Sequence, residues 1–155
     1  MTNSGQKVVE MLEQLNEKRG WHLARQNDTE WRLYVNVGDG RGQYVWVYPY
    51  WGKDVEGNDM VEVISRACEI KKLSSGLLGG KKNRTLADSL TSILAKNKTA
   101  VHVLYALNED DGHVVAKAMR MIENLSIKEL ETLIYAAAVQ GDSLEKEKHA
   151  DGDNL

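Results

Sequence analysis

A run of aromatic residues at every second position constrains the fold of this chain more than any other sequence feature. Within residues 43–51, two sets of side chains alternate: Tyr44, Trp46, Tyr48 and Tyr50, and between them Val45, Val47 and Pro49. Successive side chains of a β-strand point to opposite faces, so the run predicts a strand with one apolar and one aromatic face. The apolar face can cover a core. The aromatic face needs a second cover, which could be a helix of the same chain, a twin subunit or another polypeptide.

Further strands are expected on both sides of this run. Strand-like patterns occupy residues 30–37, 60–68, 100–107 and 113–121. Turn-forming compositions rich in Gly, Asp and Asn separate them, at residues 38–42, 54–59 and 108–112. Short turns of this kind join antiparallel neighbours. In the strand at residues 30–37, Trp31, Leu33 and Val35 lie on one side, and Arg32 and Asn36 lie on the other.

Helical spacing of apolar residues indicates two helices ahead of the last strands. Residues 6–19 form the first, with Ser4 placed to cap its start and Gly20 to end it. Residues 85–96 form the second, with a face made of Leu86, Leu90, Ile93 and Leu94.

The third helix has the clearest start signal. Ser126 and Glu129 have the spacing of a capping box, and Leu125 is placed to pack against Leu130. Gly141 is expected to end this helix. The element order is then α-β-β-β-α-β-β-α, an α+β arrangement with an antiparallel sheet of about five strands.

Length and composition indicate a single soluble domain. The chain has 155 residues, which suits one domain at residues 1–141, and we expect the polar residues 142–155 to be a disordered tail. No apolar run approaches the roughly 20 residues of a membrane helix. Cys68 is the one cysteine, so no intrachain disulfide can form. A cytoplasmic location without membrane contact is the expectation.

The charge is uneven along the chain. The net charge of −3 argues against general nucleic-acid binding. Residues 66–98 nevertheless carry eight Lys and Arg residues against two acidic ones. Lys81, Lys82 and Arg84 could therefore form an anion-binding site of a regulatory protein. The glycine loop beside them fails as a phosphate loop, because Ser75 replaces the first Gly and Lys82 replaces the Ser or Thr.

Residues with catalytic potential are few. The four histidines have no metal-ligand spacing, and His102 and Cys68 are the remaining candidates for a base or a nucleophile. We expect no cofactor, no metal and no enzymatic activity. The aromatic residues can instead form a core layer, a protein interface or, less readily, a platform for stacking bases.

The layout resembles that of the type III secretion chaperone-like superfamily, which includes class I secretion chaperones and the YbjN-type sensory-transduction regulators. The resemblance covers residues 6–141. It rests on the helix ending near Gly20, the strands at residues 31–37 and 43–51, the segment at residues 90–97, and the strand at residues 114–121 that leads into the capped helix.

The resemblance implies a homodimer without enzymatic activity that holds another polypeptide. We assign partner binding to the aromatic run, namely Tyr44, Trp46, Tyr48, Tyr50 and Trp51. In class I chaperones the second helix and the fourth strand form the dimer interface. Carried over to residues 85–96 and 100–107, that interface contains Leu86, Leu90, Ile93, Val101, Val103 and Tyr105.

Overall fold

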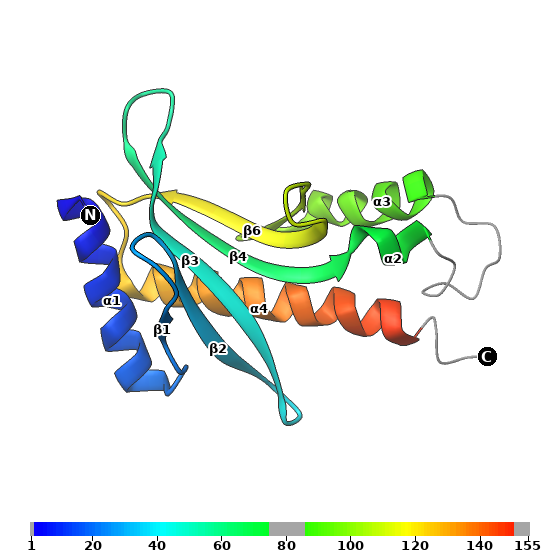
Figure 1. Ribbon diagram of the computed structural model, residues 1–155, viewed down its shortest axis with the longest axis horizontal. Coiled ribbons are helices and arrows are strands. Elements are labelled where there is room, and N and C mark those ends of the chain that lie inside the picture. The colour runs from blue at the N-terminus through cyan, green and yellow to red at the C-terminus, as the bar shows by residue number, and fades with distance from the viewer. Residues whose placement is uncertain (1, 75–85, 151–155) are drawn as a thin grey trace.

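One antiparallel sheet of six strands organises the molecule (Figure 1). The computed structural model describes residues 2–74 and 86–150. The strands are β1 (Ala24–Arg25), β2 (Trp31–Gly38), β3 (Arg41–Lys53), β4 (Asp59–Glu69), β5 (Leu104–Asn108) and β6 (His113–Met121). Their order across the sheet is β1-β2-β3-β4-β6-β5. This confirms the α+β class and the hairpin pairing, and adds the short edge strand β1.

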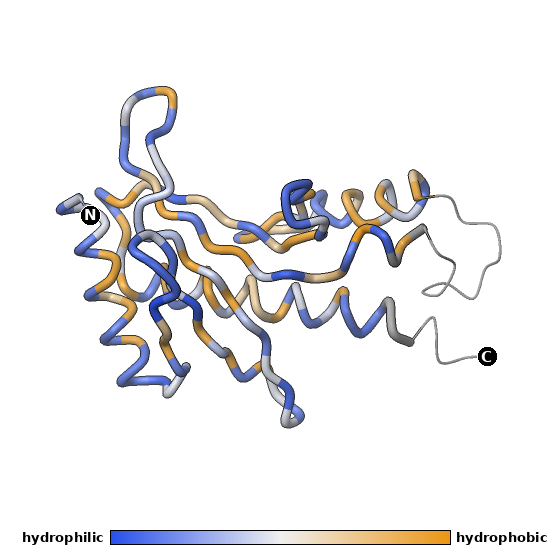
Figure 2. Tube along the Cα trace, in the orientation of Figure 1, coloured by the Kyte–Doolittle hydropathy of each residue, from blue (hydrophilic) through white to orange (hydrophobic). Residues whose placement is uncertain are grey.

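The two long helices cover one face of the sheet. Helix α1 (Asn3–Arg19) contacts β3 and β4, and α4 (Ile127–Ala150) crosses β2, β3, β4 and β6. The short α2 (Ile70–Ser74) and α3 (Leu86–Ala95) pack together, and α3 contacts β5. Beneath α1 and α4, the side chains of Leu33, Val45 and Val63 are fully buried. Figure 2 shows the apolar residues recurring along the helices and strands that form this core.

The first helix is longer than the periodicity predicted. Thr2, rather than Ser4, caps it by accepting a hydrogen bond from the Gly5 N–H at 3.1 Å. Ser4 instead donates to Asp59 Oδ2 at 2.6 Å, which joins the helix to the start of β4. Gly20 ends the helix as predicted, in a left-handed conformation with φ of 64°.

The last helix begins as predicted but does not end at Gly141. The Ser126 hydroxyl accepts a hydrogen bond from the Glu129 N–H at 3.1 Å, as an N-cap does. The helix then continues to Ala150, and Leu144 is buried. The prediction of a domain ending at residue 141 with a disordered tail is therefore wrong for residues 142–150, and residues 151–155 lie outside the described ones. A Cβ on Gly141 would lie 2.6 Å from Ser65 Oγ, so this glycine lets the helix approach the sheet.

The region between β4 and β6 departs most from the expectations. Strand β5 starts at Leu104 instead of residue 100, because α3 is followed by a 3₁₀ turn, η1 (Lys96–Thr99), and a short irregular segment. Leu94 is 39% exposed, although we expected it on the buried face of the helix. The glycine loop around residues 75–83 lies outside the described residues. No helix in the described parts of the chain is long and apolar enough to cross a membrane.

Candidate functional site

The face of the sheet opposite α1 and α4 presents the aromatic side chains. We call it the open face and define it as Arg32, Tyr34, Tyr44, Trp46, Tyr48, Glu62, Ile64, Arg66 and Lys117. Its members lie side by side because of the strand register, which pairs Tyr34 with Tyr44 and Trp46 with both Arg32 and Ile64. Tyr44 is 45% exposed, whereas its neighbour Val45 is fully buried under the helices. The alternation predicted for residues 43–48 is therefore present, and no helix of the described chain covers its aromatic side.

Three rings form a continuous row across β2 and β3. The ring centres of Tyr34 and Tyr44 are 5.1 Å apart, and those of Tyr44 and Trp46 are 6.2 Å apart. Both pairs are tilted, a geometry that aromatic pairs favour. Tyr34 lies directly over Gly42, where an added Cβ would be 2.2 Å from the Tyr34 ring. Gly42 therefore leaves the space that this ring occupies.

Basic side chains of the open face lie over two of its rings and over the neighbouring Trp51. The distances from the charged group to the ring centre are 4.7 Å for Arg32 over Tyr44, 4.7 Å for Arg66 over Trp46 and 5.4 Å for Lys117 over Trp51. These are cation–π distances. The surface thus combines Trp, Tyr and Arg side chains, the residue types enriched among those that dominate protein–protein binding.

Two of these cations also contact carboxylates. Arg66 Nε lies 3.0 Å from Asp111 Oδ2, and Lys117 Nζ pairs with the nearly buried Glu62. Glu62 stands opposite Tyr48 in the register. Burial, together with the charges of Glu30 and Glu62, raises the pKa of Tyr48.

The end of the aromatic run departs from strict alternation. The register of β3 against β4 shifts between Tyr48 and Gly52, as at a β-bulge. Trp51, which alternation places on the covered side, is 49% exposed and lies under Lys117. Tyr50 is half-buried. The assignment of Tyr44, Trp46, Tyr48, Tyr50 and Trp51 to partner binding stays a prediction, and the first three share one surface.

The sequence reasoning missed the basic half of this surface. The alternation at residues 30–37 already placed Arg32 opposite the apolar side chains. Arg66 lies on β4, the next strand of the chain, and reaches Trp46 through the β3-β4 pairing. Lys117 lies on β6, far away in sequence, and only the order β3-β4-β6 brings it to the rings.

The residues assigned to a dimer interface lie in different environments. Ile93, Val103 and Tyr105 are buried within this chain, so they cannot contact a second copy as the structure stands. Leu86 and Leu90 are half-buried, and Val101 is 79% exposed.

The other predicted sites receive no support. Lys81, Lys82 and Arg84 lie outside the described residues. His102 is exposed in the segment before β5, not inside a strand, and Cys68 is half-buried in β4 opposite Val114. Among the described residues, no group of three or more His, Cys, Asp and Glu side chains is placed to hold a metal ion.

The comparisons with known proteins concern the fold. No protein-family model matches the chain, and no curated protein matches it. Among solved structures, a chain of the HopA1–SchA chaperone–effector complex is similar, with a TM-score of 0.56 and 11% sequence identity. The match covers 94% of this chain and 98% of that chain. The chain therefore has a chaperone-like fold. At this identity the likeness shows the fold alone.

Proposed function

We propose that this chain is a non-enzymatic, chaperone-like protein that holds a segment of another polypeptide on its open face. The observation that carries the proposal is the uncovered row of Tyr34, Tyr44 and Trp46, on the side of the sheet that α1 and α4 leave free. One solved structure with a similar fold is a complex of a chaperone with an effector. That likeness supports a polypeptide as the partner.

Binding on this surface would derive mainly from the removal of aromatic area from water. Burial of apolar area contributes about 25 cal/mol per Å² before the costs of association. Trp, Tyr and Arg are the residues that most often dominate binding energy at protein interfaces. An extended segment fits such a face, because its alternate side chains can contact neighbouring rings.

We further propose that the chain forms a homodimer in the cytoplasm. Exposed apolar side chains surround the edge strand β5: Leu94, Val101, Leu104 and Leu107. An edge strand has unpaired backbone groups that a second copy can cover. This surface includes Val101 from the predicted interface and replaces its buried members with exposed neighbours. The presence of a single cysteine agrees with a reducing compartment.

Peptide arrays with matched tyrosine variants test the binding surface. Tyr44 and Tyr135 are 45% and 47% exposed, but Tyr135 lies on α4, away from the open face. We expect wild-type protein to bind a subset of extended peptides containing apolar residues. Tyr44→Ser combined with Trp46→Ser should weaken that binding at least about tenfold, and Tyr135→Ser should not. If wild-type protein binds no peptide, or if Tyr135→Ser weakens binding as much, the proposed surface is wrong.

Light scattering tests the dimer separately. Wild-type protein should have the mass of two chains, and Val101→Asp with Leu104→Asp should give one. A single-chain mass for wild-type protein at high concentration would exclude the homodimer.

A further inference from the structure

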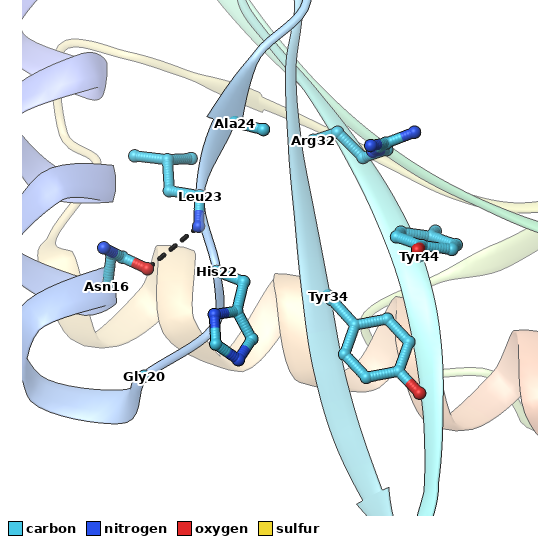
Figure 3. A pocket seen from close by; sticks show the side chains of 8 residues that line it. All are labelled: Asn16, Gly20, His22, Leu23, Ala24, Arg32, Tyr34 and Tyr44. Carbon is cyan, nitrogen blue, oxygen red and sulfur yellow. Dashed lines mark hydrogen bonds between the residues drawn. The ribbon is translucent and has the colours of Figure 1, made fainter.

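A hollow lies next to the open face, where the end of α1 meets the first two strands (Figure 3). Its volume is about 740 Å³. Three groups of residues line it: Asn16 and Gly20 at the end of α1, His22, Leu23 and Ala24 in and before β1, and Arg32, Tyr34 and Tyr44 of the sheet. Tyr34 and Tyr44 belong to the open face as well, so the hollow and the aromatic row are continuous. None of the lining residues is acidic.

The backbone around His22 is fixed in an unusual conformation. Regular antiparallel pairing from Ala24 opposite Arg32 would place His22 opposite Tyr34. Instead, the Tyr34 N–H donates to the carbonyl of Trp21 at 2.9 Å, so His22 is an extra residue, as in a β-bulge. Its φ of 44° is in the left-handed region, which non-glycine residues seldom adopt.

Asn16 holds this bulge in place. Its side-chain Oδ1 accepts a hydrogen bond from the Leu23 N–H at 2.9 Å, and its carbonyl accepts one from the Gly20 N–H at 2.8 Å. Strained backbone persists only where the surrounding structure enforces it, and such positions cluster at functional sites. The enforced conformation places the His22 ring in the wall of the hollow (Figure 3).

Arg32 is the arginine that lines the hollow, and it differs from the other described arginines in its contacts. Among the described arginines, five form an ion pair with a carboxylate: Arg19, Arg25, Arg41, Arg66 and Arg120. Arg32 forms none with any described residue. Its guanidinium carbon lies 4.7 Å from the centre of the Tyr44 ring. The contact with the ring leaves its N–H groups available to an anion.

We propose that Arg32 binds a carboxylate of the held polypeptide in this hollow, an inference that rests on the proposed function. A guanidinium and a carboxylate fit as two parallel hydrogen bonds, which makes the pair strong and directional. Tyr34, Tyr44 and His22 also line this hollow, and each of these side chains carries hydrogen-bonding groups. The preferred segment therefore carries one Asp, Glu or terminal carboxylate beside apolar residues that contact the aromatic row.

The test compares matched peptides. Peptides that bind the wild-type protein on the array are synthesised in variants in which one Asp is replaced by Asn or one Glu by Gln. Every variant is made twice, once with a free and once with an amidated C-terminus. The affinity of each peptide is measured for wild-type protein, Arg32→Gln and Arg25→Gln. Arg25 is the control, because it lies on the neighbouring strand, is also over a ring and loses the same charge, but does not line the hollow. A further variant, His22→Gly, suits the left-handed backbone and removes the ring.

We expect neutralising one carboxylate, or replacing Arg32 by Gln, to weaken binding about tenfold or more, and the two changes together to weaken it little further. Arg25→Gln should bind like wild-type protein. His22→Gly should be at least as stable as wild-type protein and bind the acidic peptides more weakly.

The peptide series also identifies which carboxylate is bound. If only amidation of the C-terminus weakens binding, the bound group is the terminal carboxylate; if replacement of a Glu or Asp weakens binding, it is that side chain. Peptides that bind equally well with and without carboxylates would overturn the inference but leave the proposed function intact. An absence of any bound peptide would refute both.

Discussion

The close contact between Gly141 and the sheet leads to a prediction that opposes ordinary helix propensity. Gly141 lies inside α4, where replacement by Ala normally stabilises a helix by about 1 kcal/mol. Here the new Cβ would lie 2.6 Å from Ser65 Oγ, 3.1 Å from Gln43 Nε2 and 3.2 Å from Ser65 Cβ. We therefore expect Gly141→Ala to destabilise the protein.

The size of the effect follows from three contributions. Adding a methyl group to a closely packed site costs about 1–3 kcal/mol. Moving the Ser65 hydroxyl breaks its 3.1 Å hydrogen bond to the Tyr44 carbonyl, at about 1 kcal/mol. The helix propensity of Ala returns about 1 kcal/mol. The net loss in the free energy of unfolding should be about 1–3 kcal/mol.

Urea unfolding at a fixed protein concentration measures this loss, and a double-mutant cycle assigns its cause. Removing the hydroxyl by Ser65→Ala leaves contacts of 3.1–3.2 Å, so this change should cost less in the Gly141→Ala background, by about 1 kcal/mol. Ser143 is on the exposed side of the same helix, and its replacement by Gly or Ala gives the ordinary propensity difference. If Gly141→Ala is more stable than wild-type protein, the close approach is not a constraint and the reasoning fails.

Four further outcomes are expected. Leu144→Ala should lower the free energy of unfolding in urea by about 2–4 kcal/mol, because Leu144 is buried beyond Gly141; a negligible change would mean that this end of α4 is unpacked. Burial raises the pKa of Asp142, but hydrogen bonds from Arg41 and Lys146 outweigh it and lower the pKa overall. The stability from Asp142 is thus present above its unfolded pKa of about 4 and is lost as the pH falls through the folded value, so thermal melts of Asp142→Asn should show a smaller acid loss. Burial, with the charge of Glu147, raises the pKa of Tyr105 to about 12; its contribution is complete below about pH 10 and is lost as the pH rises toward 12, and Tyr105→Phe should remove one late-ionising tyrosine from a spectrophotometric titration. Gly42→Ala should displace the Tyr34 ring and weaken peptide binding, and unchanged affinity would show that this ring does not contact the partner.

Local patterns predicted the elements of this fold well. The strand at residues 113–121 and the Ser126 cap have the predicted positions, because alternation and capping depend on neighbours in sequence. The aromatic and apolar sides of residues 43–48 also follow from alternation alone. That the aromatic side is open does not follow, since three helices could have been divided between the two faces.

Features that depend on distant contacts were not predictable. Gly141 carries the usual signal for a helix end, but its role is set by Ser65 on a strand far away in sequence. Val101 and Val103 have the same character in sequence, yet one is exposed and the other is fully buried. Both precede β5, in the irregular segment after η1, where strand alternation does not determine which side chain is buried. The contact of Lys117 with Trp51 required the order of the strands, because β6 pairs with β4 and not with β3.

The cations over the rings also affect the chain when no partner is bound. Exposed aromatic area favours self-association. A guanidinium or ammonium group that lies over a ring remains hydrated on the side that faces away from the ring. Water therefore stays in contact with this part of the protein surface. We therefore expect Arg32, Arg66 and Lys117, which lie over rings, to reduce self-association of the free chain. We expect the colloidal behaviour of the protein to depend on these three side chains even though none of them is part of the hydrophobic core.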